Sequence, residues 1–303
     1  MVATILRQLD LPNLPSASGV EIVGDTVYII GDDSPYLYRF TATDLRPGQH
    51  LTLFETAHFS SGRIAKAIKP DLECLTTLTT ASGETGLLVC GSGATAAREN
   101  GFWVPLSASQ GEAATVYPLT LSGLYAELRK LLPADVTLNL EAAAATTTEL
   151  LLFQRTVGST AGNLVFRMPL ATTYDYLQHR TTQTPAVKAQ GFQLPTIKGK
   201  PAGFSGACTF EDKLFVTASV EDTADAVLDG EVLGSFVGLL DLDQPTNRPM
   251  LLAHLKLPDG KPYQGKVESV AVRRQVASGR YELLLVTDDD QGGSTAVLVE
   301  VAV

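Results

Sequence analysis

The stretch Glu268-Ser269-Val270 stands at the start of a long aliphatic run, and it decides the fold because the chain repeats its pattern. Each repeat has a Ser or Glu, in most cases a small residue, and then aliphatic residues that run into a predicted strand. The five starts are Ser18-Gly19-Val20, Glu73-Cys74-Leu75, Glu141-Ala142-Ala143, Ser205-Gly206-Ala207 and Glu268-Ser269-Val270. A pattern that returns five times at strand starts indicates five copies of one structural unit.

Each start is followed by two further segments of β-rich composition. The second segments cover residues 26–30, 86–90, 150–153, 213–217 and 281–286. The third segments cover residues 36–40, 101–104, 163–167, 236–240 and 296–299. Three consecutive strands, with a fourth to complete the sheet, are typical of a propeller blade.

The two ends of the chain predict how the ring closes. The fifth unit stops at Val303 after its third strand, whereas residues 3–9 form a surplus strand before the first unit. Pairing between the two would complete the last sheet and remove an exposed edge. We therefore predict an all-β fold, a five-bladed β-propeller in a single domain of residues 1–303, closed by the N-terminal strand. The predicted blades start near residues 18, 73, 141, 205 and 268. A two-sheet sandwich would not explain the fivefold return of one motif.

Two insertions and a set of long loops depart from the repeat. Residues 121–133 carry apolar residues at helical spacing and end at a proline, which predicts a short helix. Residues 185–201, rich in Gly, Pro and Lys, predict a long connection before the fourth start. Connections that leave the second strands, such as residues 31–35 and 287–291, are long and polar. They emerge on the same face as the starts of the inner strands, so we expect the functional site there.

Composition and charge exclude several classes of function. The 303 residues contain 23 Lys and Arg against 33 Asp and Glu, a formal net charge of −10. Such a chain repels nucleic acid and anionic membrane surfaces at long range. No apolar run reaches about 18 residues, and the N-terminus lacks the pattern of an export signal, so we expect a soluble cytoplasmic protein. Cysteines 74, 90 and 208 lie in strand-like runs and are interpreted as core residues, while the four histidines share no zinc-ligand spacing.

The ordered series of starts resembles that of a known enzyme family. Ser18-Gly19, Glu73, Glu141, Gly203-Phe204-Ser205 and Lys266-Val267-Glu268 are similar to the inner-strand motifs of the calcium-activated apyrases, soluble nucleotidases built as five-bladed propellers. The helix that contains residues 126–129 and the loop of residues 31–33 are similar in placement. The resemblance runs from about residue 16 to the C-terminus and is carried by the order of short motifs. The chain also resembles an uncharacterised bacterial propeller family, from which no activity follows.

The apyrase resemblance implies a calcium ion on the axis, held by Ser18, Glu73, Glu141, Ser205 and Glu268. Three carboxylates that converge on one channel would repel each other, so something must neutralise them. Protons, basic side chains such as Lys69 or Lys266, or a hard cation with about 6–8 oxygen ligands could do so. The alternative is that these polar residues only form hydrogen bonds to backbone groups at the strand entrances.

The polar loops above this ring supply the candidate reactive groups. Asp32, Asp33, Glu221, Asp222 and Asp288 could hold a metal–phosphate substrate or orient a water molecule, and Arg155 could bind phosphate oxygens with two nitrogens. Each of the acids is equally compatible with a solvated turn.

Two functional hypotheses from different classes remain open. The first is a calcium-dependent hydrolase of phosphate esters or anhydrides, as the resemblance implies. The second is a non-catalytic binding propeller with a structural axial cation that binds a small molecule or a protein. In both, we expect the ligand to be anionic or metal-bound, because an axial cation would attract it.

Overall fold

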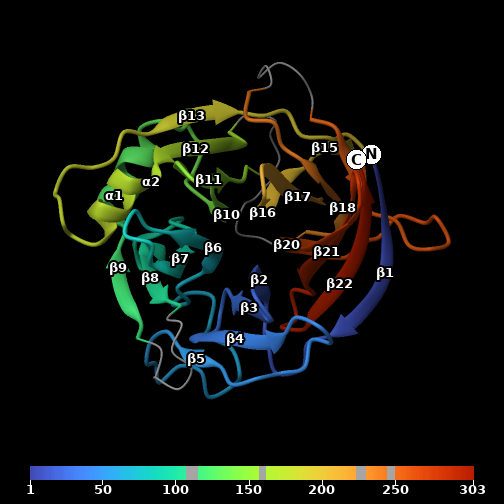
Figure 1. Cartoon of the computed structure of the whole chain (residues 1–303), viewed down its shortest axis with the longest axis horizontal. Helices are drawn as coiled ribbons and strands as arrows, with labels where there is room; N and C mark the ends of the chain where they lie inside the picture. Colours follow the sequence, from blue (N-terminus) through green and yellow to red (C-terminus); the bar gives the residue numbers. More distant parts are fainter. Residues whose placement is uncertain (107–114, 157–161, 223–229, 244–249) are drawn as a thin grey trace.

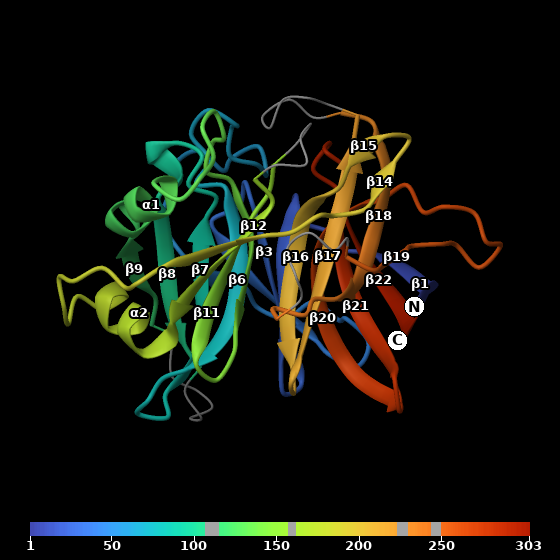
Figure 2. The same ribbon diagram turned by 90° about the horizontal axis from the view of Figure 1, so that it is seen from above.

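The predicted five-bladed propeller is confirmed. The computed structural model describes residues 1–106, 115–156, 162–222, 230–243 and 250–303. Their strands form five four-stranded antiparallel sheets arranged around a common centre (Figure 1). In the side view of Figure 2, inner strands such as β6 and β16 run from one end of the ring toward the other.

Four blades follow the chain order from the axis outward. The first has β2 (Ala17–Val23), β3 (Thr26–Gly31), β4 (Tyr36–Thr41) and β5 (Leu51–Thr52). The second has β6 (Leu72–Thr79), β7 (Thr85–Gly91), β8 (Asn100–Pro105) and β9 (Tyr117–Thr120). The third has β10 (Leu140–Ala145), β11 (Glu149–Gln154), β12 (Leu164–Pro169) and β13 (Lys188–Gly191). The fourth has β16 (Gly203–Phe210), β17 (Lys213–Glu221), β18 (Val232–Leu239) and β19 (Leu252–His254).

The fifth blade closes the ring with strands from both ends of the chain. Its order is β20 (Lys266–Ala277), β21 (Arg280–Asp288), β22 (Ser294–Ala302) and β1 (Val2–Asp10). β1 pairs with β22 along its length, and Figure 1 shows the two strands side by side with the termini close together. The side chains of Ala3 and Ile5 are buried against the neighbouring blade, whereas Leu6 lies at a bulge and is exposed. The predicted closure is therefore confirmed.

Apolar side chains fill the spaces between successive blades. Five buried clusters lie between blades 1 and 2, 2 and 3, 3 and 4, 4 and 5, and 5 and 1. In the cluster between blades 5 and 1, for example, Val20 and Ile29 share a core with Leu284 and Val286. Because each cluster needs two blades, the burial that stabilises the fold depends on a complete ring.

Two helices pack on the outside of blades 2 and 3. α1 (Ser122–Arg129) confirms the predicted helix, and it buries Leu124 and Leu128 in the cluster between these blades. α2 (Leu170–Leu177) was not predicted; it follows β12 directly, and its Tyr174 ring packs edge-on against Trp103.

The long connection at residues 185–201 contains more structure than the sequence indicates. It includes β13, the outer strand of blade 3, and a small hairpin of β14 (Thr196–Ile197) and β15 (Lys200–Pro201). A short 3-10 turn, η1 (Ala96–Arg98), lies between β7 and β8. Outer strands bury little apolar surface, so their sequences carry only a weak strand pattern.

The cysteines follow expectation, and the histidines differ in their exposure. All three cysteines are buried and free, which fits their interpretation as core residues. His50, His58 and His179 are exposed, but His254 is partly buried beside the Phe236 ring. Among the described residues, no helix is long and apolar enough to cross a membrane.

We predict that replacement of Ile5 by Ala lowers the free energy of unfolding by about 2–5 kcal/mol, because it opens a cavity where β1 covers blade 5. Leu6→Ala is the matched control: Leu6 is 53% exposed, so its loss is expected to change stability by about 0.5 kcal/mol or less. Urea denaturation of both variants measures the difference. Equal effects would contradict the packing of β1 described above.

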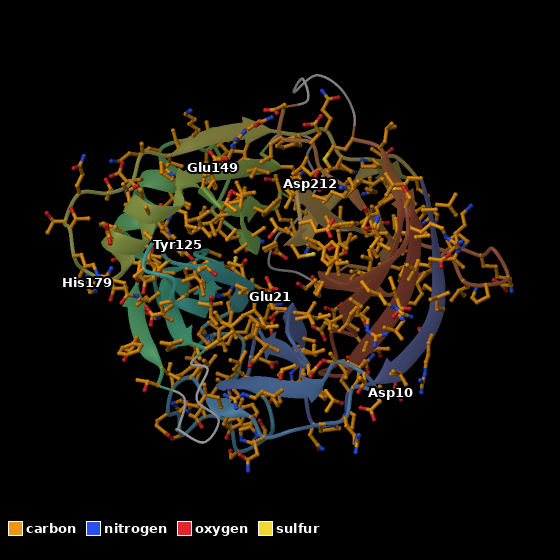
Figure 3. All side chains as sticks on the ribbon, in the orientation of Figure 1. Asp10, Glu21, Tyr125, Glu149, His179 and Asp212 are labelled. Atoms are coloured by element: carbon orange, nitrogen blue, oxygen red, sulfur yellow. The ribbon has the colours of Figure 1, made fainter. Side chains whose placement is uncertain are left out.

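A second prediction concerns Glu21, which lies near the axis on β2 (Figure 3). Burial raises the pKa of this carboxyl to about 7, although the Thr77 backbone N–H donates a hydrogen bond to it. The folded state therefore holds a proton that the unfolded chain releases above its ordinary pKa of 4.5. The free energy of unfolding is expected to fall as pH rises from about 4.5 to about 7. Glu21→Gln is expected to remove this contribution to the pH dependence of stability. Denaturation at pH 5 and pH 8, with the exposed Glu55→Gln as control, tests it; an unchanged slope in Glu21→Gln would contradict it.

Candidate functional site at the axial mouth

A bulge marks the same position in all five inner strands. The pairing register shifts between residues 17 and 19, 72 and 74, 140 and 142, 204 and 206, and 267 and 269. The residues at these shifts are the five motif residues Ser18, Glu73, Glu141, Ser205 and Glu268. A bulge redirects the side chain of the extra residue, and bulges are frequent beside functional sites.

The small residue after each motif position is explained by close approach of the neighbouring blade. A Cβ atom added to Gly206 would lie 2.6 Å from the Cα of Ser269, and one added to Gly19 would lie 2.8 Å from the Cβ of Leu75. Inner strands crowd together near the axis, so larger side chains would not fit there.

One cavity of about 610 Å³ opens on the axis, and we name it the axial mouth. Its lining comes from the bulged ends of inner strands, from the loops that leave the second strands, and from the connection between β5 and β6. The predicted residues that line it are Ser18, Glu73, Glu141, Glu268, Asp32, Asp33, Arg155, Glu221 and Asp288. The structure thus brings together, on one face, most of the residues singled out in the sequence. Parts of two loops expected on this face, residues 157–161 and 223–229, lie outside the described residues.

Two predicted residues lie apart from the mouth. Ser205 is fully buried and donates a hydrogen bond to the Thr217 hydroxyl at 3.2 Å. Asp222 is about half exposed and pairs with Lys200 at 2.7 Å. Neither lines the described cavity.

The motif serines and glutamates behave differently. Ser18 lines the mouth, but its hydroxyl donates to the backbone oxygen of Leu72 at 2.5 Å. Ser18 therefore forms the hydrogen bond to a backbone group that the structural alternative foresaw, whereas Ser205 bonds to another side chain. Two of the motif glutamates, Glu141 and Glu268, instead form salt bridges with basic side chains.

Arg155 joins two blades through a buried pair of salt bridges. One guanidinium nitrogen lies 3.1 Å from Glu141 and another lies 2.7 Å from Glu221, at the end of β17. The Arg155 side chain is only 6% exposed. Burial opposes ionisation of Glu221, but Arg155 and Lys266 outweigh it and hold the Glu221 pKa below its usual value. We expected the two terminal guanidinium nitrogens of Arg155 to bind phosphate oxygens, but both already form salt bridges within the protein.

Lys266 connects blade 5 to the same network. Its ammonium lies 3.2 Å from Glu268, 3.3 Å from Glu221 and 3.0 Å from Asp290. Burial lowers the tendency of Lys266 to ionise, yet these carboxylates raise its pKa well above the ordinary value. Burial nevertheless raises the pKa of Glu268 to about 8.

A third basic side chain, Lys69, pairs with carboxylates of blades 1 and 2 on the other side of the mouth. Lys69 contacts Asp32 and lies 2.9 Å from Asp71, whose other oxygen accepts from Arg98 at 2.7 Å. Burial raises the pKa of Asp32 to about 7, opposed chiefly by the charge of Lys69. Oδ1 of Asp32 is buried and accepts no hydrogen bond from any described residue.

Glu73 differs from the other axial glutamates. Its carboxylate has no hydrogen bond or ion pair within the part of the chain that the structure describes. Burial raises its pKa well above the ordinary value, and the negative charges of Asp71, Glu141 and Asp32 add to the shift. Glu73 is therefore the axial carboxylate that most lacks a cation.

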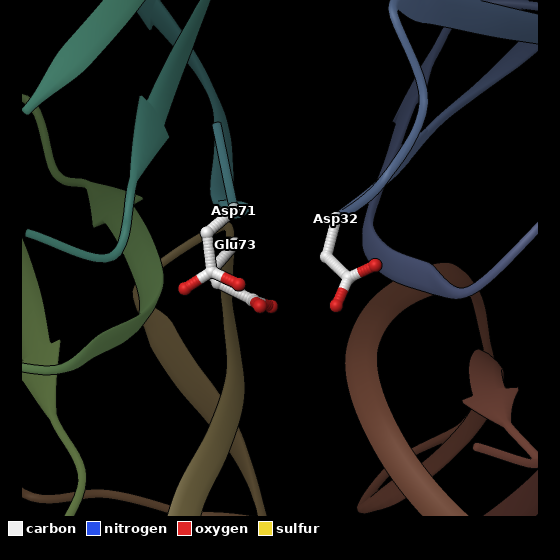
Figure 4. Close-up of side chains that lie close together, drawn as sticks. All are labelled: Asp32, Asp71 and Glu73. Carbon is white, nitrogen blue, oxygen red and sulfur yellow. The ribbon is translucent and has the colours of Figure 1, made fainter. Parts of the chain in front are cut away.

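The closest group of carboxylates is not the ring that the resemblance implies. Ligand oxygens of Asp32, Asp71 and Glu73 all lie within 4.8 Å of one another, and the three side chains face a common space (Figure 4). Among the described residues, this is the one such group with three carboxylates. Oxygens at this spacing suit a calcium ion, which takes oxygen ligands at about 2.3–2.6 Å.

Sequence reasoning missed several lining residues, and one signal could have found some of them. Asp71 and Asn139 each stand two positions before a motif glutamate and line the mouth, as does Lys266, which the sequence had already suggested as a neutralising cation. Residues two apart on a strand share a face, so this position was a candidate. Arg63 and Arg98 reach the mouth from a loop and a turn, for which no repeat exists.

We predict that Arg155→Met lowers the free energy of unfolding at neutral pH by about 3–5 kcal/mol, because it leaves the buried Glu141 without its cation and Glu221 with Lys266 alone. Arg46→Met is the control, since Arg46 is 75% exposed in its pair with Asp44 and its loss is expected to cost about 0.5 kcal/mol or less. Chemical denaturation at pH 7 compares the two. Similar small effects would show that the buried network does not support the fold.

The comparisons with known proteins concern family and fold. The solved structure of Myxococcus xanthus glutaminyl cyclase has 10% identity and a TM-score of 0.48 over 100% of this chain and 97% of its own. Cellvibrio cellulosa α-L-arabinanase has 13% identity and a TM-score of 0.47, covering 96% of this chain and 92% of its own. At this level of similarity these structures say nothing about activity. No curated protein matches the sequence. A family model does match residues 13–302, so the chain belongs to the family of unknown function DUF6929.

Proposed function

We propose that this protein binds a divalent cation, calcium, at Asp32, Asp71 and Glu73, and uses it to hydrolyse phosphate esters or anhydrides in the axial mouth. The observation that carries the proposal is the group of three carboxylates within 4.8 Å, one of which lacks a partner among the described residues. The apyrase resemblance supports the choice of calcium and of a phosphate substrate. The ligand set differs from the implied ring, with only Glu73 in common.

The charge of the mouth supports a bound cation. Its described lining includes nine carboxylates and six Lys or Arg side chains. The six basic side chains leave no excess of positive charge in the mouth, so an anionic substrate would bind there more readily if a cation entered first or with it. A bound calcium ion would supply positive charge to the phosphate oxygens, where negative charge accumulates during phosphoryl transfer.

The protein's own groups would orient the substrate and water. Arg63 pairs with Asp33 at one side of the mouth, and its side chain is 41% exposed, so it can also reach phosphate oxygens. Burial raises the pKa of Asp288 to about 6, which leaves it ionised at neutral pH and suited to accept a proton from water. The water oxygen would bond to phosphorus as the bond from phosphorus to the leaving oxygen breaks, and the leaving oxygen would take up a proton.

A second candidate function is a binding propeller without catalysis. The buried pairs of Arg155, Lys266 and Lys69 favour it, because they fix many of the polar groups before any ligand arrives. Such a preformed mouth would bind a small anionic molecule through its cation and would not need to move a proton.

Calorimetric titration with calcium chloride tests the cation site. Wild-type protein is expected to bind calcium and to gain about 2.7 kcal/mol of stability at a calcium concentration one hundred times the dissociation constant. Glu73→Gln is expected to weaken binding at least tenfold. Asp222→Asn is the matched control, because it removes one acid that lies outside the cavity and should leave calcium affinity unchanged.

A panel of phosphate esters and nucleotides, with calcium or with a chelator, then separates the two functions. Hydrolysis that requires calcium and falls in Glu73→Gln supports the enzyme. Calcium binding with no turnover of any compound supports the binding propeller. Absence of calcium binding at millimolar concentration would contradict both.

A further inference from the structure

We propose that Lys69 competes with the cation, so that cation binding expels the Lys69 ammonium and loosens the chain segment that carries it. The inference rests on the cation site proposed above and adds its regulation. We name residues 57–69 the strap; it lies in the connection between β5 and β6, and many of its side chains line the axial mouth.

The contacts of Lys69 place it on two of the three ligand residues. Its ammonium contacts Asp32 and lies 2.9 Å from Oδ1 of Asp71, and its side chain is only 12% exposed. Glu73, the third ligand residue, is close enough for its charge to act on Lys69. The positive charge that neutralises this group is therefore supplied from within the chain.

An ammonium and a metal ion cannot share this space. The three ligand oxygens lie within 4.8 Å of one another, so a cation bound between them would lie against the nitrogen of Lys69. Two positive charges at such a distance repel each other strongly in a partly buried site. Binding must therefore exchange one cation for the other.

The surrounding contacts prepare the carboxylates for such an exchange. Oδ2 of Asp71 accepts from Arg98 at 2.7 Å and also from the Ser92 hydroxyl. These bonds keep Asp71 oriented after Lys69 leaves, and its Oδ1 is then free for an ion. Asp32 already has one buried oxygen that accepts no hydrogen bond among the described residues.

The middle of the strap and its C-terminal end are anchored differently. The Ile64 N–H donates to the backbone oxygen of Asp33 at 2.8 Å, and Arg63 bonds to the Asp33 carboxylate. The far end turns back on itself, where Ile68 and Lys69 donate to the backbone oxygen of Ala65. The Ile68 side chain is 49% exposed, and the Lys69 ion pairs, together with the hydrogen bond from Arg98 to the backbone oxygen of Lys66, hold this end of the strap.

The first experiment compares calcium affinity in two lysine variants by calorimetry. Lys69→Met removes the competitor and is expected to raise affinity at least tenfold. Lys200→Met removes the same charge from a residue that pairs with Asp222 outside the mouth, and is expected to raise affinity less than about threefold through long-range charge alone. Equal affinities in the two variants would overturn the exchange while leaving the cation site intact. No calcium binding to wild type or to Lys69→Met would overturn both proposals.

The second experiment uses wild-type protein and so does not depend on the folding of a variant. Hydrogen exchange with and without calcium is expected to show faster exchange at the Ile68 and Lys69 amides, while the Ile64 amide stays unchanged as the internal reference. Unchanged or slower exchange at residues 68 and 69, in protein that calorimetry shows to be saturated with calcium, would contradict the release of Lys69.

Discussion

The structure depends on one constraint: several carboxylates are buried at the axial mouth, where the inner strands of the five blades begin. Four of the five residues at the bulges of the inner strands line the mouth, and three of these are glutamates. Buried like charges are costly unless cations compensate them. Arg155, Lys266 and Lys69 provide that compensation, and each connects neighbouring blades near the axis.

The pairing of carboxylates with basic side chains differs between the two sides of the mouth. Blades 3, 4 and 5 share a continuous network in which Glu141, Glu221 and Glu268 all contact a basic side chain. On the side of blades 1 and 2, a single lysine from a surface connection serves two aspartates, and Glu73 has no partner among the described residues. The carboxylates on the first side are therefore already paired with cations, whereas the second side has an unpaired carboxyl group among the described residues and depends on Lys69 of the strap.

The sequence predicted the blades well because inner and middle strands are buried, and burial imposes a strong apolar pattern on them. It also identified the bulged residues, since a polar residue at the start of an apolar strand stands out. It did not predict α2, which buries Leu170, Tyr174 and Leu177 but contains weak helix formers such as Thr172 and Thr173. It also did not predict β13, which buries little surface, or which carboxylate each basic side chain would contact. Arg63 reaches Asp33 and Lys69 reaches Asp32 from a connection that no repeat marks, so only the folded chain brings them together. The same is true of Arg155, which the sequence offered to a ligand and the structure pairs with two glutamates.

The central claim is that the carboxylates of Asp32, Asp71 and Glu73 form a cation site that an internal lysine fills in the absence of the ion. Anomalous diffraction from crystals soaked in terbium chloride, a heavy stand-in for calcium, tests it most directly. The account predicts an anomalous peak between these three side chains, with the Lys69 ammonium displaced from Asp32 and Asp71. A peak elsewhere in the mouth, or none, with Lys69 still bound to both aspartates, would contradict it.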